Sequence, residues 1–343
     1  MRVGVLTGGG DAPGLNAAIR AVARRCFELG DEPIGIRNGW AGLMGAGNVR
    51  PLQPTDVSGI LHLGGTILGT SRTNPFKEDH GSQQVLENLQ RAQIDAIVAI
   101  GGDDTLSVAC RLSDLGVRVV GVPKTVDNDL SETDYCIGYD TAVTAVVDAL
   151  DRLHATASAH HRVLVTEVMG RDAGWVAVAG GLAGGADFIV IPEVPIDVDR
   201  ICEHLRRRFA MGKEFSLIVV AEGVTMPEVV SKEAIREVDA FGHVRLDRRG
   251  VGETLSRVIE QRTGLETRVM VLGHLQRGGS PSAIDRIWAT RFGVEAVDAV
   301  HDGAFGVMVS LKDGRLRRVS IASAVGRMKT VDLGLYRLAE IFY

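Results

Sequence analysis

Residues 95–106 read DAIVAIGGDDTL and combine three local signals in twelve positions. Residues 96–100 form an unbroken apolar run, which is typical of a strand covered on both faces of a sheet. Two glycines and two aspartates follow, and a helical pattern then begins at Leu106. A strand, a glycine turn and an acidic helix start, in that order, indicate an α/β fold.

The same alternation continues in both directions along the chain. Further apolar runs predict strands at 2–7, 117–123, 161–170, 187–193, 215–223 and 267–274. Helical patterns lie between them, at Leu15–Leu29, Leu106–Leu115, Thr141–Ala157, Val198–Ala210, Thr254–Arg262 and Ala283–Val300. The alternation predicts parallel sheets with helices on both sides, in two sandwiches between which the chain crosses more than once.

Composition limits the class of protein. The 343 residues suit two domains, and 45% hydrophobic with 24% charged residues suits a soluble chain with a large core. The net charge of −5 gives no general face for nucleic acid. Four cysteines without a C-x-x-C pair argue against zinc and indicate reduced thiols. Without a signal peptide or a long apolar span, we expect a cytoplasmic protein that does not enter a membrane.

Two glycine-rich turns follow predicted strands. Thr7–Asn16, TGGGDAPGLN, lets backbone N–H groups approach a phosphate, although a tight strand–helix turn explains it equally well. In the second turn, Asp103 or Asp104 could simply cap the following helix. Because two adjacent acids do not easily share that cap, we favour one as a ligand of phosphate-bound Mg²⁺.

Residues 124–129, KTVDND, carry the most specific signal. Phosphoryl transfer to a hydroxyl needs a base and a metal ligand, and Asp127 and Asp129 can supply both. An Asx-turn is the alternative, since Asp-Asn-Asp is suited to one. The position after a strand favours the functional interpretation.

The second half of the chain has its own polar strand ends. Gly170 permits close backbone approach and Arg171 can reach an anion, although a surface ion pair would also explain this arginine. His274 and Arg277 share a turn with two glycines and could hold a phosphomonoester. Glu222 ends another strand, whereas Arg162 and Arg268 precede strands and could be solvated.

Together these motifs resemble the 6-phosphofructokinase family along nearly the whole chain. The segments occur in family order: GVLTGGGDAPGLNA, GGTILGTSR, AIGGDDT, KTVDND, TEVMGR, VAEG and GHLQRGGSP. The resemblance implies two three-layer α/β/α (Rossmann-like) domains with the active site in the cleft between them. Residues 1–138 plus about 276–326 would form the phosphoryl-donor (pyrophosphate/Mg) domain, and 139–275 plus about 327–343 the fructose 6-phosphate domain.

The resemblance also implies a reaction, the transfer of a phosphoryl group to O1 of fructose 6-phosphate with Mg²⁺. Asp127 would accept the proton of the sugar 1-hydroxyl, Asp103 would bind Mg²⁺, and Asp129 would support the metal–phosphate region. Thr125 and Arg171 would hold the transferring phosphoryl. Gly10 would lie against the donor phosphates, with Arg72 nearby.

The sugar would be bound by residues of the second half. Met169, Gly170 and Glu222 would contact it, and its 6-phosphate would be held by His274, Arg277, Arg162 and Arg268. In the family a neighbouring subunit supplies the last two, so the resemblance implies a homodimer or homotetramer with shared active sites.

Two positions depart from the ATP-using members of the family, which typically have glycine where this chain has Asp104 and Lys124. The pair resembles the branch that uses diphosphate, and Lys124 would act both in catalysis and in donor selection. We therefore expect a reversible diphosphate-dependent enzyme of glycolysis and gluconeogenesis. Pro54, His154 and Met211 replace basic residues of the effector pocket of regulated members, which argues against nucleotide control.

Three alternatives remain at this point. An ATP-dependent 6-phosphofructokinase is the alternative within the same reaction class. A lipid or NAD kinase shares the GGDG-like turn but lacks the sugar-site segments. A non-catalytic sugar-phosphate sensor would have no need of a base at Asp127.

Overall fold

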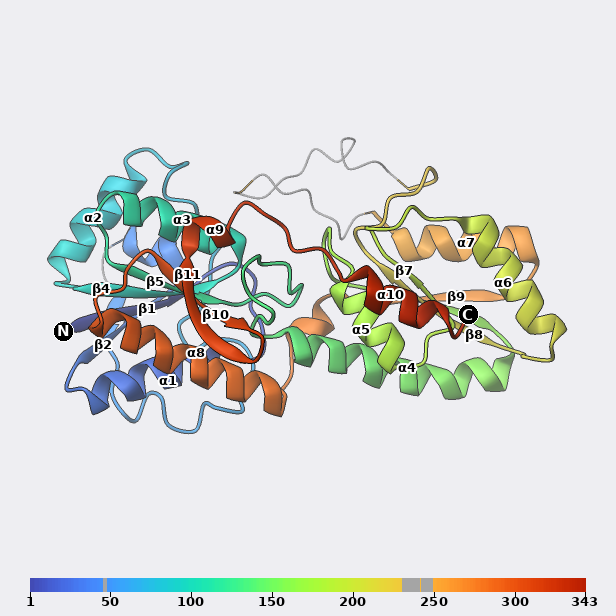
Figure 1. Cartoon of the computed structure of the whole chain (residues 1–343), viewed down its shortest axis with the longest axis horizontal. Coiled ribbons are helices and arrows are strands. Elements are labelled where there is room, and N and C mark those ends of the chain that lie inside the picture. The colour runs from blue at the N-terminus through green and yellow to red at the C-terminus, as the bar shows by residue number, and fades with distance from the viewer. Residues whose placement is uncertain (46–47, 230–240, 242–248) are drawn as a thin grey trace.

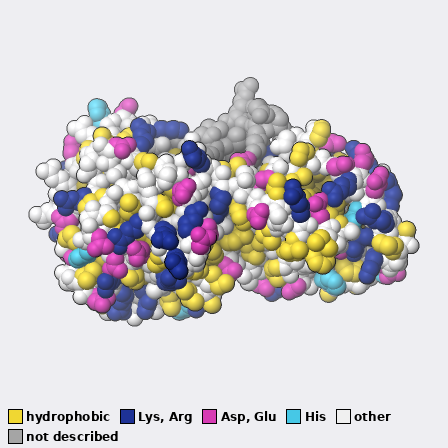
Figure 2. Space-filling model, in the orientation of Figure 1, with side chains coloured by type: hydrophobic (Ala, Val, Ile, Leu, Met, Phe, Trp, Pro, Cys, Tyr) yellow, Lys and Arg dark blue, Asp and Glu magenta, His cyan; other side chains and the backbone are white. Residues whose placement is uncertain are grey.

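The computed structural model describes residues 1–45, 48–229, 241 and 249–343. It consists of two lobes, each built on its own sheet, joined by a neck (Figure 1). Figure 2 shows the surface hollowed at this neck, with apolar side chains gathered beside it on the visible face. The protein thus has the predicted α/β class and a separate sheet in each half.

The first sheet has seven strands in the order β11-β10-β5-β4-β1-β2-β3. Its strands are β1 (Arg2–Thr7), β2 (Glu32–Ile36), β3 (Val49–Pro51), β4 (Ala96–Gly101), β5 (Val119–Pro123), β10 (Val307–Lys312) and β11 (Arg315–Ser320). Both faces are covered, because alternate residues of β4 enter two different cores: Val98 and Ile100 on one side, Ile97 and Ala99 on the other.

The helices around this sheet divide between its faces. One core contains side chains of α1 (Leu15–Glu28) and α8 (Ala283–His301), which pack against each other. The opposite core contains α2 (Gly81–Arg91), α3 (Asp103–Asp114), the 3-10 turn η1 (Gly39–Leu43) and the short α9 (Ile321–Ala324). This arrangement is the predicted layer of helices on each side of a sheet.

The second sheet has four parallel strands in the order β7-β8-β6-β9. They are β6 (Val163–Val168), β7 (Phe188–Val190), β8 (Ser216–Ala221) and β9 (Thr267–Val271). Helices α4 and α5 lie on one side in Figure 1, and α6 and α7 on the other. The helices of this lobe are α4 (Tyr139–His160), α5 (Trp175–Ala183), α6 (Val198–Ala210), α7 (Val251–Thr263) and α10 (Leu333–Glu340).

The expectation of purely parallel sheets is wrong at both edges of the first sheet. β3 runs antiparallel to β2, and β11 runs antiparallel to β10. The β10–β11 hairpin turns at Asp313 (φ 49°) and Gly314 (φ 72°), and this positive-φ pair is what a two-residue hairpin turn requires. Such hairpins let a parallel sheet end without a further crossover helix.

Adjacent strands bring the predicted motifs to one edge. β5, β4 and β1 are neighbours, and each is followed by one of the three polar turns. The turns are fastened to neighbouring strands, since Gly8 N–H donates to Ile100 O (3.0 Å) and Lys124 N–H donates to Gly101 O (3.0 Å). Among the described residues no helix is both long and apolar enough to span a bilayer.

Candidate active site

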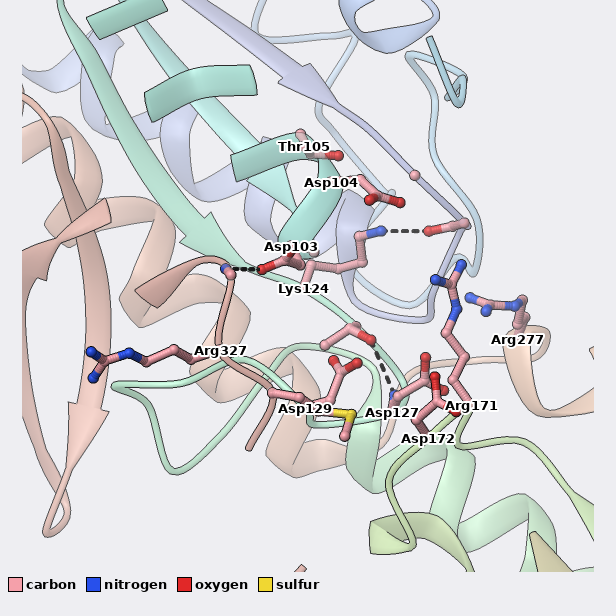
Figure 3. Close-up of a pocket in the computed structure, with 16 residues that line it drawn as sticks. Asp103, Asp104, Thr105, Lys124, Asp127, Asp129, Arg171, Asp172, Arg277 and Arg327 are labelled. Carbon is pink, nitrogen blue, oxygen red and sulfur yellow. Dashed lines mark hydrogen bonds between the residues drawn. The ribbon is translucent and has the colours of Figure 1, made fainter. Parts of the chain in front are cut away.

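A cavity of about 310 Å³ lies where the turns of the first lobe meet the Arg171 turn of the second (Figure 3). Nine of the sequence-predicted site residues line it: Gly10, Asp103, Asp104, Lys124, Thr125, Asp127, Asp129, Arg171 and Arg277. Its volume is at the lower end of the range for small-molecule sites. The described part of the chain thus brings acids and cations from five separate turns to one space.

The glycine turns are shaped by close packing. A Cβ at Gly8 or Gly101 would lie 2.5 Å or 2.3 Å from the side chain of Thr105. At Gly10, a Cβ would lie 2.6 Å from the guanidinium Nη1 of Arg277. These glycines are therefore needed so that the two loops and Arg277 can approach one another.

Lys124 is the buried cation of the site, with only 3% of its surface exposed. Its ammonium donates hydrogen bonds to Gly8 O (2.9 Å) and Gly10 O (2.5 Å), and these two bonds hold the first glycine turn in place. Burial first, and the charge of Arg277 second, lower the pKa of Lys124 to about 7. The ammonium thus holds the loop and adds a positive charge next to the space for an anion.

Asp127 and Asp129 lie in a strained turn, in which the intervening Asn128 has φ 50°. Asp127 is 3% exposed, and its Oδ1 atom has no hydrogen-bond partner among the described residues. Its N–H donates to Thr125 Oγ1 (3.2 Å), which orients the turn. Burial, followed by the charge of Asp127, raises the pKa of Asp129 to about 7. An unpaired buried carboxylate oxygen is suited to accept a proton or to bind a cation.

Asp103 and Asp104 form the acidic start of α3. Asp103 Oδ1 accepts a hydrogen bond from Gly326 N–H at 2.8 Å, so it is tied to a distant segment and not only to its own helix. The first residue of α3 is Asp103, and its preceding residue Gly102 makes no side-chain cap. Both acids face the cavity in which they were predicted.

The Arg171 turn belongs to the second lobe and is unusually constrained. Arg171 has φ 48°, and its N–H donates to Glu222 Oε1 at 3.2 Å. A Cβ at Gly223 would lie 1.5 Å from Arg171 O, which explains the glycine of the VAEG segment. Burial and the charge of Asp127 raise the pKa of Glu222 to about 7.

Seven predicted residues do not line this cavity: Arg72, Arg162, Met169, Gly170, Glu222, Arg268 and His274. Met169 is buried against Ala12 and Val126, and Gly170, at φ 148°, bends the chain toward Arg171. Arg162 and Arg268 converge instead on Glu266 Oε1, at 2.8 Å and 2.6 Å. Glu222 does not line the cavity itself, but it accepts a hydrogen bond from the backbone N–H of Arg171, which does.

Sequence reasoning missed seven lining residues: Gly9, Gly102, Thr105, Asp172, Gly326, Arg327 and Met328. The first four adjoin predicted residues and could have been found by extending the motifs. The last three come from the coil after α9, where no strand end, glycine pair or acid pair marked a site.

Comparisons with known proteins agree on one family. The family model described as Phosphofructokinase matches residues 2–300. The pyrophosphate–fructose 6-phosphate 1-phosphotransferase of Amycolatopsis mediterranei (strain S699) is 54% identical over 345 residues, covering all of both chains. The ATP-dependent 6-phosphofructokinase of Corynebacterium efficiens is 46% identical over 344 residues, covering 100% of this chain and 99% of that protein.

A solved structure extends the likeness to the fold. The pyrophosphate-dependent phosphofructokinase of Marinobacter aquaeolei superposes with a TM-score of 0.83, over 97% of this chain and 86% of that one, at 22% sequence identity. At this identity the likeness concerns the two-lobed architecture alone.

Proposed function

The chain belongs to the phosphofructokinase family, and on that premise we propose that its cavity is the active site of a diphosphate-dependent 6-phosphofructokinase. The enzyme transfers a phosphoryl group from diphosphate to O1 of fructose 6-phosphate, giving fructose 1,6-bisphosphate and phosphate. The reaction belongs to glycolysis and, in reverse, to gluconeogenesis. Residues 1–138 plus about 276–326 form the donor domain in this proposal, and 139–275 plus about 327–343 the sugar domain.

The observation that carries the proposal is the convergence of Lys124, Asp127 and Arg171 on one cavity. In the forward direction Asp127 takes the proton of the 1-hydroxyl while O1 bonds to the nearer phosphorus. The bridging P–O bond breaks, and its electron pair leaves with the departing phosphate. Thr125 and Arg171 hold the transferring group, whose charge is spread over its oxygens in the transition state. A sugar-phosphate sensor would have no use for this buried, unpaired carboxylate.

The acids fit a magnesium ion that arrives with phosphate. Mg²⁺ keeps several waters and takes one or two carboxylates together with substrate phosphates. Within the ranges that the structure describes, no group of three or more His, Cys, Asp or Glu is arranged to hold a metal alone. Asp103 and Asp129 would therefore supply the protein oxygens, and the ion would neutralise phosphate charge during transfer.

Asp104 and Lys124 select the donor in this proposal. The resemblance described above supports this assignment, since it implies glycine at both positions in ATP-using members. A nucleotide α-phosphate next to position 104 would face the Asp104 carboxylate. Two like charges about 4 Å apart repel by about 4 kcal/mol at an effective dielectric of 20. Gly10 and Arg72 would complete the donor side, since the charge of Arg72 acts on Lys124.

The sugar would lie on the second-lobe side of the cavity, against Met169, Gly170 and Glu222. Arg277 lines the cavity, and His274 lies three residues after the end of β9, on the same turn. Arg277 would hold the 6-phosphate together with His274. The buried Arg277 donates to Asp11 O at 3.0 Å, which places its guanidinium between the glycine turn and the second lobe.

Arg162 and Arg268 would complete the 6-phosphate site of a neighbouring copy, in a homodimer or homotetramer. Two observations support this. Neither arginine lines the cavity of its own chain. Arg268 is on β9, the edge strand of this sheet among the described residues, and Arg162 directly precedes the neighbouring strand β6. Strand β9 and the turn after it also expose three large apolar side chains, Met270, Val271 and Leu275. A cytoplasmic enzyme without membrane or nucleic-acid partners fits these substrates.

The test is a choice of donor. Purified protein is given fructose 6-phosphate, Mg²⁺ and either diphosphate or ATP, and fructose 1,6-bisphosphate is measured through a coupled aldolase assay. We expect turnover with diphosphate and none with ATP, and the variant Asp104→Gly should gain measurable ATP use. Turnover with ATP alone would instead establish the ATP-dependent alternative, and sugar-phosphate binding without turnover would establish a sensor.

A further inference from the structure

The coil Gly326–Val331, which we call the strap, joins α9 on the first lobe to α10 on the second. In Figure 1 it is the red segment that passes from α9 to α10 across the neck. Gly326, Arg327 and Met328 line the cavity, although the chemistry described above uses none of their side chains. The question is why this segment lies there.

On the donor side, the strap is bonded to both acidic turns. Gly326 N–H donates to Asp103 Oδ1 at 2.8 Å, and Lys329 N–H donates to Asp129 O at 2.8 Å. Between these two bonds, Met328 pairs with Leu130 in an isolated antiparallel bridge. The strap therefore fixes the start of α3 and the Asp127–Asp129 turn relative to each other.

On the sugar side, the same strap is bonded to the start of α5. The indole Nε1–H of Trp175 donates to Lys329 O at 2.9 Å, and the Lys329 ammonium lies 5.1 Å from the centre of the Trp175 ring. Glu193 makes the second connection. Its Oε1 atom accepts from Val331 N–H (3.0 Å) and from Gly174 N–H (2.9 Å), and Gly174 stands three residues after Arg171.

We propose that the strap sets the position of the Arg171 turn relative to the acidic turns, and that Glu193 is the positioning residue that joins them. The proposal rests on the proposed function, since it concerns the geometry of that same cavity. Phosphoryl transfer depends on alignment, and a displacement of about 1 Å can cost about 10²-fold in rate. One carboxylate that holds a backbone N–H group after the Arg171 turn and another in the strap is placed to prevent such a displacement.

The hydrogen-bond pattern supplies its own conservative variant. Oε1 accepts from both N–H groups, and Oε2 is a second, longer acceptor for Gly174 N–H at 3.1 Å. Glu193→Gln can therefore keep the two Oε1 bonds through its amide oxygen and loses only the longer contact, whereas Glu193→Ala loses all three. Glu340→Gln is the matched control, because Glu340 lies on α10 and pairs with Arg200 at 2.8 Å, away from the cavity. We expect Glu193→Ala to lower kcat about tenfold or more while both KM values stay within about threefold, as loss of alignment requires. Glu193→Gln and Glu340→Gln should stay near wild type.

A second measurement reads the strap without catalysis. Acrylamide quenching of Trp175, taken as the difference from a Trp175→Phe variant, should increase in Glu193→Ala and not in Glu193→Gln. Wild-type kcat and wild-type quenching in Glu193→Ala would overturn the inference, as would equal losses in the alanine and glutamine variants. If the wild type itself shows no turnover, the proposed function fails, and the quenching comparison still reports whether Glu193 holds the strap.

Discussion

Replacing Lys124 with methionine tests its two roles together, holding the glycine turn and binding the donor. The ammonium is 3% exposed and donates to Gly8 O and Gly10 O. Hydrogen bonds from a charged group contribute about 1.5–3 kcal/mol each. Methionine keeps the unbranched shape but removes both bonds and the charge. Because the loop that faces the donor loses its anchor and the donor loses a neighbouring positive charge, we expect kcat/KM for diphosphate to fall roughly 10²-fold, which corresponds to about 3 kcal/mol.

Stability should change much less than activity. Burial lowers the pKa of Lys124 to about 7, which means that the charged ammonium is destabilised in the folded protein relative to water. An apolar replacement removes that opposition together with the hydrogen bonds, and the two effects offset each other to within about 1 kcal/mol. Urea unfolding of wild type and Lys124→Met at neutral pH measures this difference. A large loss of stability would show that the activity change reports misfolding and not donor binding.

The pH dependence gives the sharper test. The pKa of Lys124 is about 7 in the folded protein against 10.5 when unperturbed, so the ammonium is lost as pH rises above about 7. The KM for diphosphate should therefore rise with pH in the wild type, beyond the change caused by ionisation of diphosphate itself. Lys124→Met experiences the same diphosphate ionisation and should lack the additional rise. Coupled assays from pH 6 to pH 9 on both proteins measure it. Identical pH profiles, or kcat/KM within about threefold of wild type in the variant, would refute the assigned role.

Two further predictions follow from the base and from the shared site. Asp127→Asn should lower kcat by roughly 10² or more while fructose 6-phosphate binding, measured by calorimetry, changes little, because the substitution removes the proton acceptor and keeps the shape; near wild-type turnover would exclude Asp127 as the base. Mixing Asp127→Ser with Arg162→Ala subunits, each nearly inactive alone, should restore activity through hybrid oligomers, and no recovery after subunit exchange would mean that each chain builds its own site.

Much of the fold was predictable because its strands are buried on both faces. The run at 96–100 contains no polar residue, so it is easily recognised as a buried strand, and side chains on both faces of β4 enter a core. β10 and β11 were missed, although Asp313-Gly314 is a recognised hairpin signal; β10 is rich in apolar residues, but β11 contains three arginines. β3 could not be found in this way, because it has only three residues, two of them exposed.

The site was predictable where side chains line the cavity, and it was not predictable where backbone groups make the contacts. Asp103, Asp127 and Arg171 stand at strand ends, and the order of neighbouring strands brings them together. The strap has no such pattern, since its contacts to Asp103 and Asp129 are made by main-chain N–H groups. Any sequence offers those donors, so only the path of the chain reveals them.

The charge of the cavity explains how a phosphate site tolerates so many acids. Five aspartates and four cations line it, which leaves one net negative charge when all are ionised. Such a lining repels a bare polyanion, but a donor accompanied by a dication brings its own compensation. Because Asp129 and Lys124 both have pKa values of about 7, the cavity can also adjust its charge by a proton as the donor enters. Asp104 would then distinguish the two donors by their size, since a nucleotide continues beyond its phosphates and diphosphate does not. In the proposed donor site, diphosphate would end near the Asp104 carboxylate, whereas a nucleotide would have to extend past it. We therefore expect the acid that the one donor tolerates to exclude the other.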